Sequence, residues 1–153
     1  MRVRHVPATL AALLAAPAAG FTPVATIDGP ARVVDGDTLF VGAVEVRLQG
    51  IAAPEHGARR TDPGGAAATD ALRGWAEGRT VRCDLDGTRT RGREVGVCHV
   101  DGMELNAALV EAGVARDCPR YSGGRYADRE AAARAAGVDL SERYALPDDC
   151  RRR

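Results

Sequence analysis

Residues 32–55 read RVVDGDTLFVGAVEVRLQGIAAPE and alternate apolar with polar side chains. This alternation is typical of strands that turn one face toward a core. Gly36 and Gly42 interrupt the apolar runs, at places where a tight turn favours glycine. The stretch therefore predicts short strands at 39–41 and 44–48, joined around Gly42.

Four charged side chains in this stretch are each open to two interpretations. Asp35 and Asp37 flank Gly36, so both carboxylates can face one concavity and hold a hard cation such as Ca²⁺. The same three residues also suit a plain hairpin turn. Arg47 interrupts an apolar alternation and Glu55 follows a proline, so each is either a surface residue or a group that acts on a substrate.

The charge composition limits how the chain can bind an anionic partner. Its 153 residues include 21 basic and 21 acidic side chains, and every basic one is an arginine. A balanced charge argues against a protein that coats nucleic acid through bulk positive potential. Any phosphate recognition must be local, and the forked guanidinium group suits it.

The first twenty residues have the composition of an export signal. Arg2, Arg4 and His5 precede an apolar run at 8–16, and small residues follow up to Gly20. The run is too short to span a bilayer, so we predict a signal peptide at 1–20 rather than a membrane helix. The alternative is an uncleaved amphipathic start. We expect residues 21–153 to form one domain, periplasmic or secreted, with no membrane contact after cleavage.

Export makes the cysteines candidates for disulfides. Cys83, Cys98, Cys118 and Cys150 allow three pairings. Strands at 80–83 and 95–100 flank a turn-rich loop, and as antiparallel neighbours they would place Cys83 opposite Cys98. We favour 83–98 with 118–150. Zinc binding is the alternative, but the chain has no C-x-x-C motif.

The remaining segments predict a small, mainly β fold. Apolar periodicity indicates helices at 66–76, 104–112 and 125–136, and extended segments are expected at 24–27 and 31–34, broken at 29–30. A loop is expected at 57–65. Five short strands with about three helices inserted between and after them suggest an α+β fold built on a barrel of the OB type.

Four motifs, taken together and in order, resemble the staphylococcal nuclease (thermonuclease) family. They are VVDGDTL at 33–39, VRLQGIAAPE at 46–55, RGR at 91–93 and DGMELNAALVEAGVAR at 101–116. CPRYSGGRYADREAAARAAG at 118–137 is similar to exported bacterial members of that family. The resemblance implies a five-stranded OB barrel with three helices, and Ca²⁺-dependent hydrolysis of phosphodiester bonds in DNA and RNA.

The resemblance also implies a role for individual residues. Asp37 would ligate calcium directly, Asp35 would lie in the outer shell, and the backbone carbonyl of Ala53 would be a further ligand. Arg47 and Arg93 would grip the scissile phosphate, because guanidinium groups absorb the charge that builds on its oxygens. Glu55 would take a proton from the attacking water.

The chain departs from the family pattern at several places. Ala52 stands where the family usually has the second calcium-binding Asp. Ala53 replaces a Thr that binds calcium through its backbone carbonyl, a group that alanine also has. The loop at 89–93 lacks the usual acidic residue and tyrosine, and no G-x-W motif is found around 140–144. Because cation affinity follows ligand charge, Ala52 is expected to weaken calcium binding.

These observations are compatible with three functions, of which the third involves no nucleic acid. The first is a calcium-dependent nuclease, expected to be a monomer. The alternative is a catalytically weak or inactive nuclease-like domain that binds nucleic acid or another anionic partner. The third is an exported OB-type domain with a structural or protein-binding role. Tyr121, Tyr126 and Tyr144 are open to interpretation as stacking surfaces or as core and surface filler.

Overall fold

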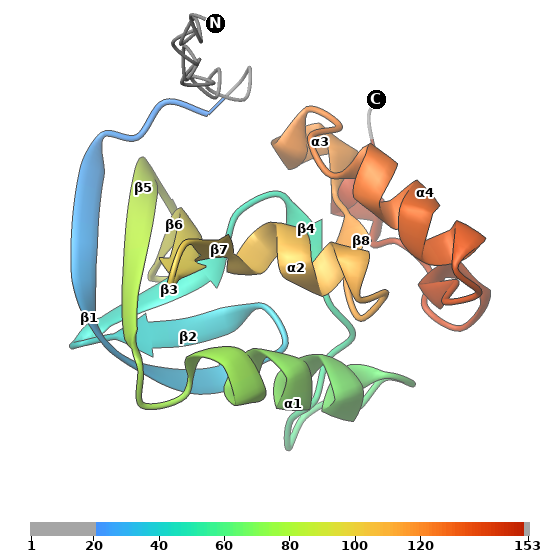
Figure 1. Ribbon diagram of the computed structural model, residues 1–153, viewed down its shortest axis with the longest axis horizontal. Coiled ribbons are helices and arrows are strands. Elements are labelled where there is room, and N and C mark those ends of the chain that lie inside the picture. The colour runs from blue at the N-terminus through green and yellow to red at the C-terminus, as the bar shows by residue number, and fades with distance from the viewer. Residues whose placement is uncertain (1–20, 152–153) are drawn as a thin grey trace, which may run out of the picture.

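The computed structural model describes residues 21–151, so the predicted signal peptide at 1–20 lies outside the described part. The strands are β1 (Ala25–Asp35), β2 (Thr38–Val41), β3 (Val44–Leu48), β4 (Ile51–Ala52), β5 (Thr80–Thr90), β6 (Arg93–Val100), β7 (Met103–Glu104) and β8 (Arg116–Asp117). The helices are α1 (Gly65–Ala76), α2 (Leu105–Glu111), α3 (Pro119–Ser122) and α4 (Ala127–Ala135), with 3-10 turns η1 (Leu140–Glu142) and η2 (Asp148–Cys150). Figure 1 shows the longer strands gathered on one side and α2, α3 and α4 on the other.

Five of the strands close into a ring. β1 pairs antiparallel with β2 and β5, β2 with β3, and β5 with β6, while a parallel contact between β3 and β6 completes the circuit. β7 extends the sheet beyond β6, and β4 pairs with β8 in a separate ribbon. The predicted α+β class, with an OB-like ring of five strands, is confirmed. The sequence did not predict β4, β7, β8 or the short α3.

The predicted break at 29–30 is wrong, because β1 runs through both residues. The strand pairs with β5 as far as Pro30 and with β2 from Ala31 onward. Pro30 therefore lies where the strand changes partner, and its carbonyl accepts a bond from the Gly42 N–H (3.0 Å). Proline has no backbone N–H, and it is tolerated at this position because no hydrogen bond of the sheet requires one there.

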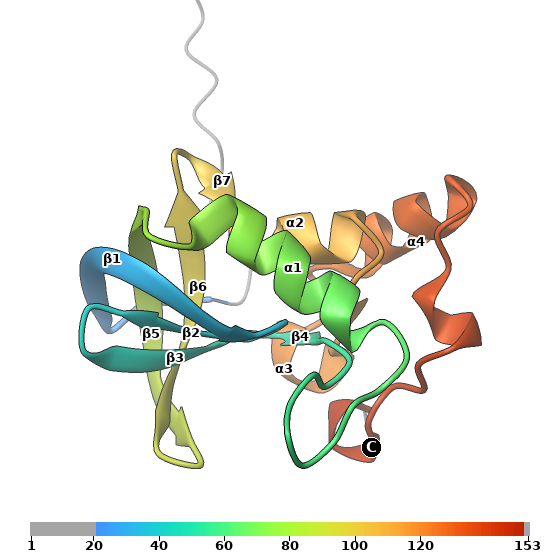
Figure 2. The ribbon, with the colours of Figure 1, turned by 90° about the horizontal axis from the view of Figure 1, so that it is seen from below.

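The core fills the ring and the space beneath α1 and α2. Leu39, Val46 and Leu72 are among its fully buried side chains. Leu72 of α1 and Leu105 and Leu109 of α2 face this core, as the helical spacing predicted. Ala112, which was expected on the same face of the second helix, is exposed. Figure 2 shows α1 crossing the front of the strands, with the loop that precedes it beside the end of β4. Within residues 21–151, no helix is long and apolar enough to cross a bilayer.

A second, smaller apolar cluster anchors the C-terminal segment. It contains Ala52, Cys118, Leu140, Tyr144 and Cys150, with Leu146 packed against it. A disulfide joins Cys118 to Cys150, and another joins Cys83 to Cys98 across β5 and β6. These are the two pairs that the sequence analysis favours. The C-terminal segment is thereby tied to β4, which leads into Glu55.

The loop between β4 and α1 depends on a close approach at the start of the helix. A Cβ atom on Gly65 would lie 2.1 Å from the Glu55 carbonyl oxygen, so only glycine fits there. Gly74, in the same helix, has nothing within 4 Å of its equivalent position. The two glycines of α1 therefore have opposite roles.

We expect Gly65→Ala to lower the free energy of unfolding by about 1–3 kcal/mol, because the loop carrying Glu55 must move away. Gly74→Ala should raise it by about 0.5–1 kcal/mol, since alanine is the better helix former. Urea denaturation of both variants measures the difference. Equal stabilisation by the two substitutions would show that the close approach is absent.

Candidate functional site

Strand register gathers three polar side chains on the outer face of the ring. Thr38 on β2 lies directly opposite Arg47 on β3. Arg47 in turn is aligned with Val95 on β6, and Arg93 is two residues before it on the same strand. Since side chains two apart share a face, Thr38, Arg47 and Arg93 point to the same side.

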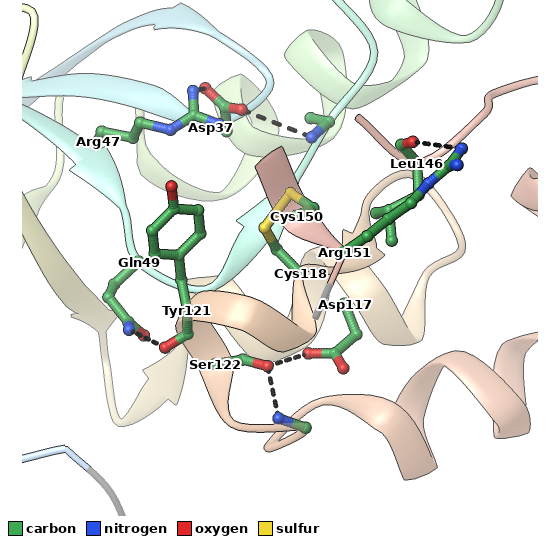
Figure 3. Close-up of a disulfide and its surroundings, with 12 residues drawn as sticks. Asp37, Arg47, Gln49, Asp117, Cys118, Tyr121, Ser122, Leu146, Cys150 and Arg151 are labelled. Carbon is green, nitrogen blue, oxygen red and sulfur yellow. Dashed lines mark hydrogen bonds and ion pairs between the residues drawn. A yellow bond between two sulfur atoms is a disulfide. The ribbon is translucent and has the colours of Figure 1, made fainter. Parts of the chain in front are cut away.

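Hydrogen bonds link these side chains to Asp37. Arg47 Nη1 donates to Asp37 Oδ1 (2.7 Å), and the Thr38 hydroxyl donates to the same oxygen (3.0 Å). Arg93 Nη1 donates to Thr38 Oγ1 (2.9 Å). Figure 3 shows the carboxylate of Asp37 against the Arg47 guanidinium, with a further bond to a backbone nitrogen. The site thus holds two cationic groups around one buried anion.

The Asp35–Asp37 turn is packed tightly beneath α1. A Cβ on Gly36 would lie 2.5 Å from the Ala68 Cβ and 3.0 Å from the Ala53 Cβ. The Asp35 carboxylate accepts the Asp37 N–H (3.1 Å), which fixes the turn locally. Asp37 is only 5% exposed as a result.

Burial changes the acidity of Asp37. Loss of hydration raises the pKa of this carboxyl to about 6; the Arg47 cation opposes the rise, and the Asp35 and Glu55 charges add to it. At neutral pH Asp37 is mostly ionised, so the ion pair with Arg47 persists.

Glu55 is exposed at the start of a loop, and Asp62 bonds back to its backbone. Asp62 Oδ2 accepts the Glu55 N–H (3.2 Å), while the Asp62 N–H donates to the Glu55 carbonyl (2.8 Å). Arg60 donates to the other Asp62 oxygen (2.8 Å). The backbone of Glu55 is therefore held from two sides, while its carboxylate stays accessible to solvent.

The two alanines of the expected metal site have different surroundings. Ala52 is 1% exposed and belongs to the second apolar cluster. The Ala53 N–H lies 3.5 Å from Asp37 Oδ2, and the Ala53 carbonyl accepts a bond from the Tyr144 hydroxyl (3.1 Å). Burial, followed by the charges of Asp37, Asp62 and Glu55, raises the pKa of Tyr144 to about 12, so the hydroxyl is a donor at neutral pH.

The donors present fit a divalent cation only as an incomplete set. Among residues 21–151, no three His, Cys, Asp or Glu side chains are grouped to hold a metal. The Asp37 N–H bonds the Asp35 carboxylate and the Ala53 N–H lies 3.5 Å from Asp37, so these three residues adjoin, and oxygen is the donor that Ca²⁺ prefers. Calcium needs six to eight such ligands, so most must come from water or from a phosphate.

The β5–β6 hairpin and α3 form the rim of the site. Arg89 pairs with Glu94, and Arg91 is exposed at the tip with a left-handed backbone (φ 50). Arg93, unlike these two, turns back onto Thr38. On α3, Tyr121 is 52% exposed, and Gln49 Nε2 donates to its carbonyl (2.7 Å). Figure 3 shows this bond beside the Cys118–Cys150 disulfide.

The structure brings the predicted residues together from four segments of the chain. Asp35, Asp37, Arg47 and Arg93 join through hydrogen bonds, register and charge, and Ala53 and Glu55 follow directly from β4. Sequence reasoning assigned no role to Thr38 or Asp62, and it considered Tyr144 only as a stacking surface or as filler. Thr38 follows Asp37 directly and Asp62 precedes a Pro-Gly-Gly turn, so local signals existed for both. Tyr144 gave none, because it lies 91 residues from its partner.

Comparison with known proteins matches most of the chain to a described family. Residues 45–140 match the family described as staphylococcal nuclease homologue. The chain is also similar to the succinoglycan biosynthesis protein ExoI of Rhizobium meliloti (strain 1021). The two are 34% identical over 147 residues, which cover 90% of this chain and 75% of that protein. The matched family segment includes Arg47, Glu55 and Arg93.

The raised pKa of Asp37 predicts a pH-dependent stability. The folded chain binds more protons than the unfolded chain between the ordinary pKa of 3.8 and about 6, so stability falls as pH rises through that window. We expect Asp37→Asn to abolish this fall. The stability of the variant relative to wild type should grow by up to about 3 kcal/mol between about pH 4 and pH 7.

Urea denaturation at several pH values measures this difference. Asp70→Asn, which removes an exposed carboxylate of α1, is the matched control and should give no comparable trend. A constant stability difference between Asp37→Asn and wild type over this range would contradict the burial of an ionised Asp37.

Proposed function

Because the chain belongs to the staphylococcal nuclease family, we propose that it hydrolyses phosphodiester bonds of DNA or RNA. The observation that carries the proposal is the convergence of Arg47 and Arg93 on the Asp37–Thr38 pair, with Glu55 two residues after Ala53, whose N–H lies 3.5 Å from Asp37. Two guanidinium groups and a carboxylate are the charges that such a reaction requires.

The proposed chemistry divides between binding and proton transfer. Arg47 and Arg93 bind the non-bridging oxygens of the phosphate and stabilise the charge that develops on them. Thr38 orients Arg93, and Asp37 orients Arg47, so both forks are held before the substrate arrives. Glu55 accepts a proton from the attacking water, and Asp62 fixes the backbone from which Glu55 projects.

A divalent cation, Ca²⁺ as the family implies, would be held by Asp37, with Asp35 and the Ala53 carbonyl beside it. When bound, it supplies further positive charge at the phosphate. Because Arg47 and Thr38 already bind Asp37 Oδ1, only the second carboxylate oxygen of Asp37 is available to the cation without rearrangement. We propose a weak calcium site that the phosphate helps to complete.

The exported state is part of the proposal. The two disulfides suit an oxidising compartment, and the signal-like residues 1–20 suit export to the periplasm or the medium. We further propose that residues 21–153 act as one monomeric domain.

A catalytically weak or inactive protein that binds an anionic partner is the second candidate. Two observations favour it: Ala52 carries no ligand, and Arg47 satisfies Asp37 from within the protein. The name of the similar protein ExoI refers to succinoglycan biosynthesis and not to a nuclease. The arginine pair alone would suffice to bind a phosphate or another oxyanion.

Glu55→Gln tests the enzymatic proposal. We expect the rate of single-stranded DNA and RNA cleavage to fall by at least about a hundredfold, because the base is lost, with little change in substrate affinity. Arg93→Ala should lower both the cleavage rate and the substrate affinity. Arg91→Asn, on the same hairpin, should leave the rate and the affinity close to wild type. Cleavage that persists unchanged in Glu55→Gln would show that Glu55 is not the base.

Ala52→Asp separates the two candidates. The new carboxylate adds charge beside the proposed cation site, so we expect cleavage in Ca²⁺ to rise by about tenfold or more. Without cation the variant should lose about 2–4 kcal/mol of stability, because Ala52 is buried among apolar side chains. If wild type cleaves nothing in any divalent cation and Ala52→Asp does, the second candidate is correct.

A further inference from the structure

Tyr144 reaches the site from the far end of the chain. Its hydroxyl donates to the Ala53 carbonyl (3.1 Å), and the side chain is 8% exposed. The N–H of Ala53 lies 3.5 Å from Asp37 Oδ2, so the carbonyl that Tyr144 binds belongs to a residue in contact with Asp37.

The C-terminal segment holds Tyr144 firmly in this position. Arg116 Nη1 donates to the Tyr144 carbonyl (3.1 Å), and the Tyr144 N–H donates to the Leu140 carbonyl (2.9 Å). Arg116 is itself paired with Glu130 of α4 (2.9 Å). The Cys118–Cys150 disulfide closes the segment onto β4 and α3. The hydrogen bond between Tyr144 and Ala53 is therefore held in place by the packing of the C-terminal segment.

The hydrogen bond changes Ala53 as a potential ligand. A carbonyl oxygen offers two lone pairs, and the Tyr144 hydroxyl takes one of them. The hydroxyl hydrogen also brings the positive end of a dipole to the oxygen that a cation would approach. Both effects weaken the attraction between this oxygen and a cation.

We propose that Tyr144 is a positioning residue that holds the Ala53 carbonyl and lowers the cation affinity of the site. The inference rests on the proposed function in taking Ala53 as part of a cation site, but it does not require catalysis. Ala52 and Tyr144 both disfavour a bound cation, so phosphate binding depends more on Arg47 and Arg93.

Calcium titration of the purified, oxidised protein without nucleic acid tests this role. We expect Tyr144→Phe to bind Ca²⁺ about three- to tenfold more tightly than wild type, as one hydrogen bond is removed from the competing carbonyl. The calcium-dependent rise in Tm should be larger for the variant by the same reasoning. Isothermal calorimetry and a thermal melt give the two readings.

Tyr126→Phe is the matched control. Tyr126 is 1% exposed and its hydroxyl donates to Glu104 Oε1 (2.7 Å), away from Ala53, so its loss should lower stability without changing calcium affinity. A merely structural Tyr144 would behave in the same way.

Three results would overturn the proposal: unchanged or weaker calcium binding by Tyr144→Phe, an equal change in Tyr126→Phe, or no binding by wild type and Tyr144→Phe alike. The nuclease proposal fails separately, by absence of cleavage, so the two failures are distinguishable.

Discussion

The parallel contact between β3 and β6 is the constraint on which the site depends. It closes the ring. Its register aligns Arg47 with Val95, two residues after Arg93, so both arginines lie on the same face. Asn106 of α2 reinforces the closure from inside: it accepts the Cys98 N–H (3.0 Å) and donates to the Gln49 and Gly96 carbonyls (2.9 and 3.2 Å). A slip of one residue between these strands would turn one arginine away from the other.

Asp37 connects this geometry to its electrostatics. An ionised carboxylate that is 5% exposed requires compensation, and Arg47 provides it at 2.7 Å, with Thr38 as a second donor. The compensation is incomplete, because burial still raises the pKa of Asp37. The Arg47 side chain remains 27% exposed, so it neutralises Asp37 while part of it stays accessible to solvent. One buried anion thus orients one arginine directly and another through Thr38.

Local patterns predicted most of the fold and little of its closure. Period-two alternation gave β2 and β3, and helical spacing gave α1, α2 and α4 to within about two residues. Opposed strands placed Cys83 beside Cys98. In contrast, β3 and β6 are separated along the chain by β4, α1 and β5, so no hairpin turn connects them. Tyr144 bonds Ala53 across a sequence separation of 91 residues. Such contacts arise from packing of the whole ring and leave no periodic signal. The break expected at Pro30 failed because the strand changes partner there.

The substitution at residue 52 is consistent with the packing around it. A carboxylate there would need either a cation or a cationic side chain to offset its burial. The chain instead packs Ala52 beneath the Cys118–Cys150 disulfide, Leu140 and Tyr144, which form an apolar cover. Tyr144, one residue of that cover, donates its hydroxyl to the carbonyl of the neighbouring Ala53. In the proposed cation site, the alanine at residue 52 and the hydrogen-bonded carbonyl at residue 53 would both weaken cation binding. Both leave Arg47 and Arg93 as the positive charges nearest to any phosphate that the site binds.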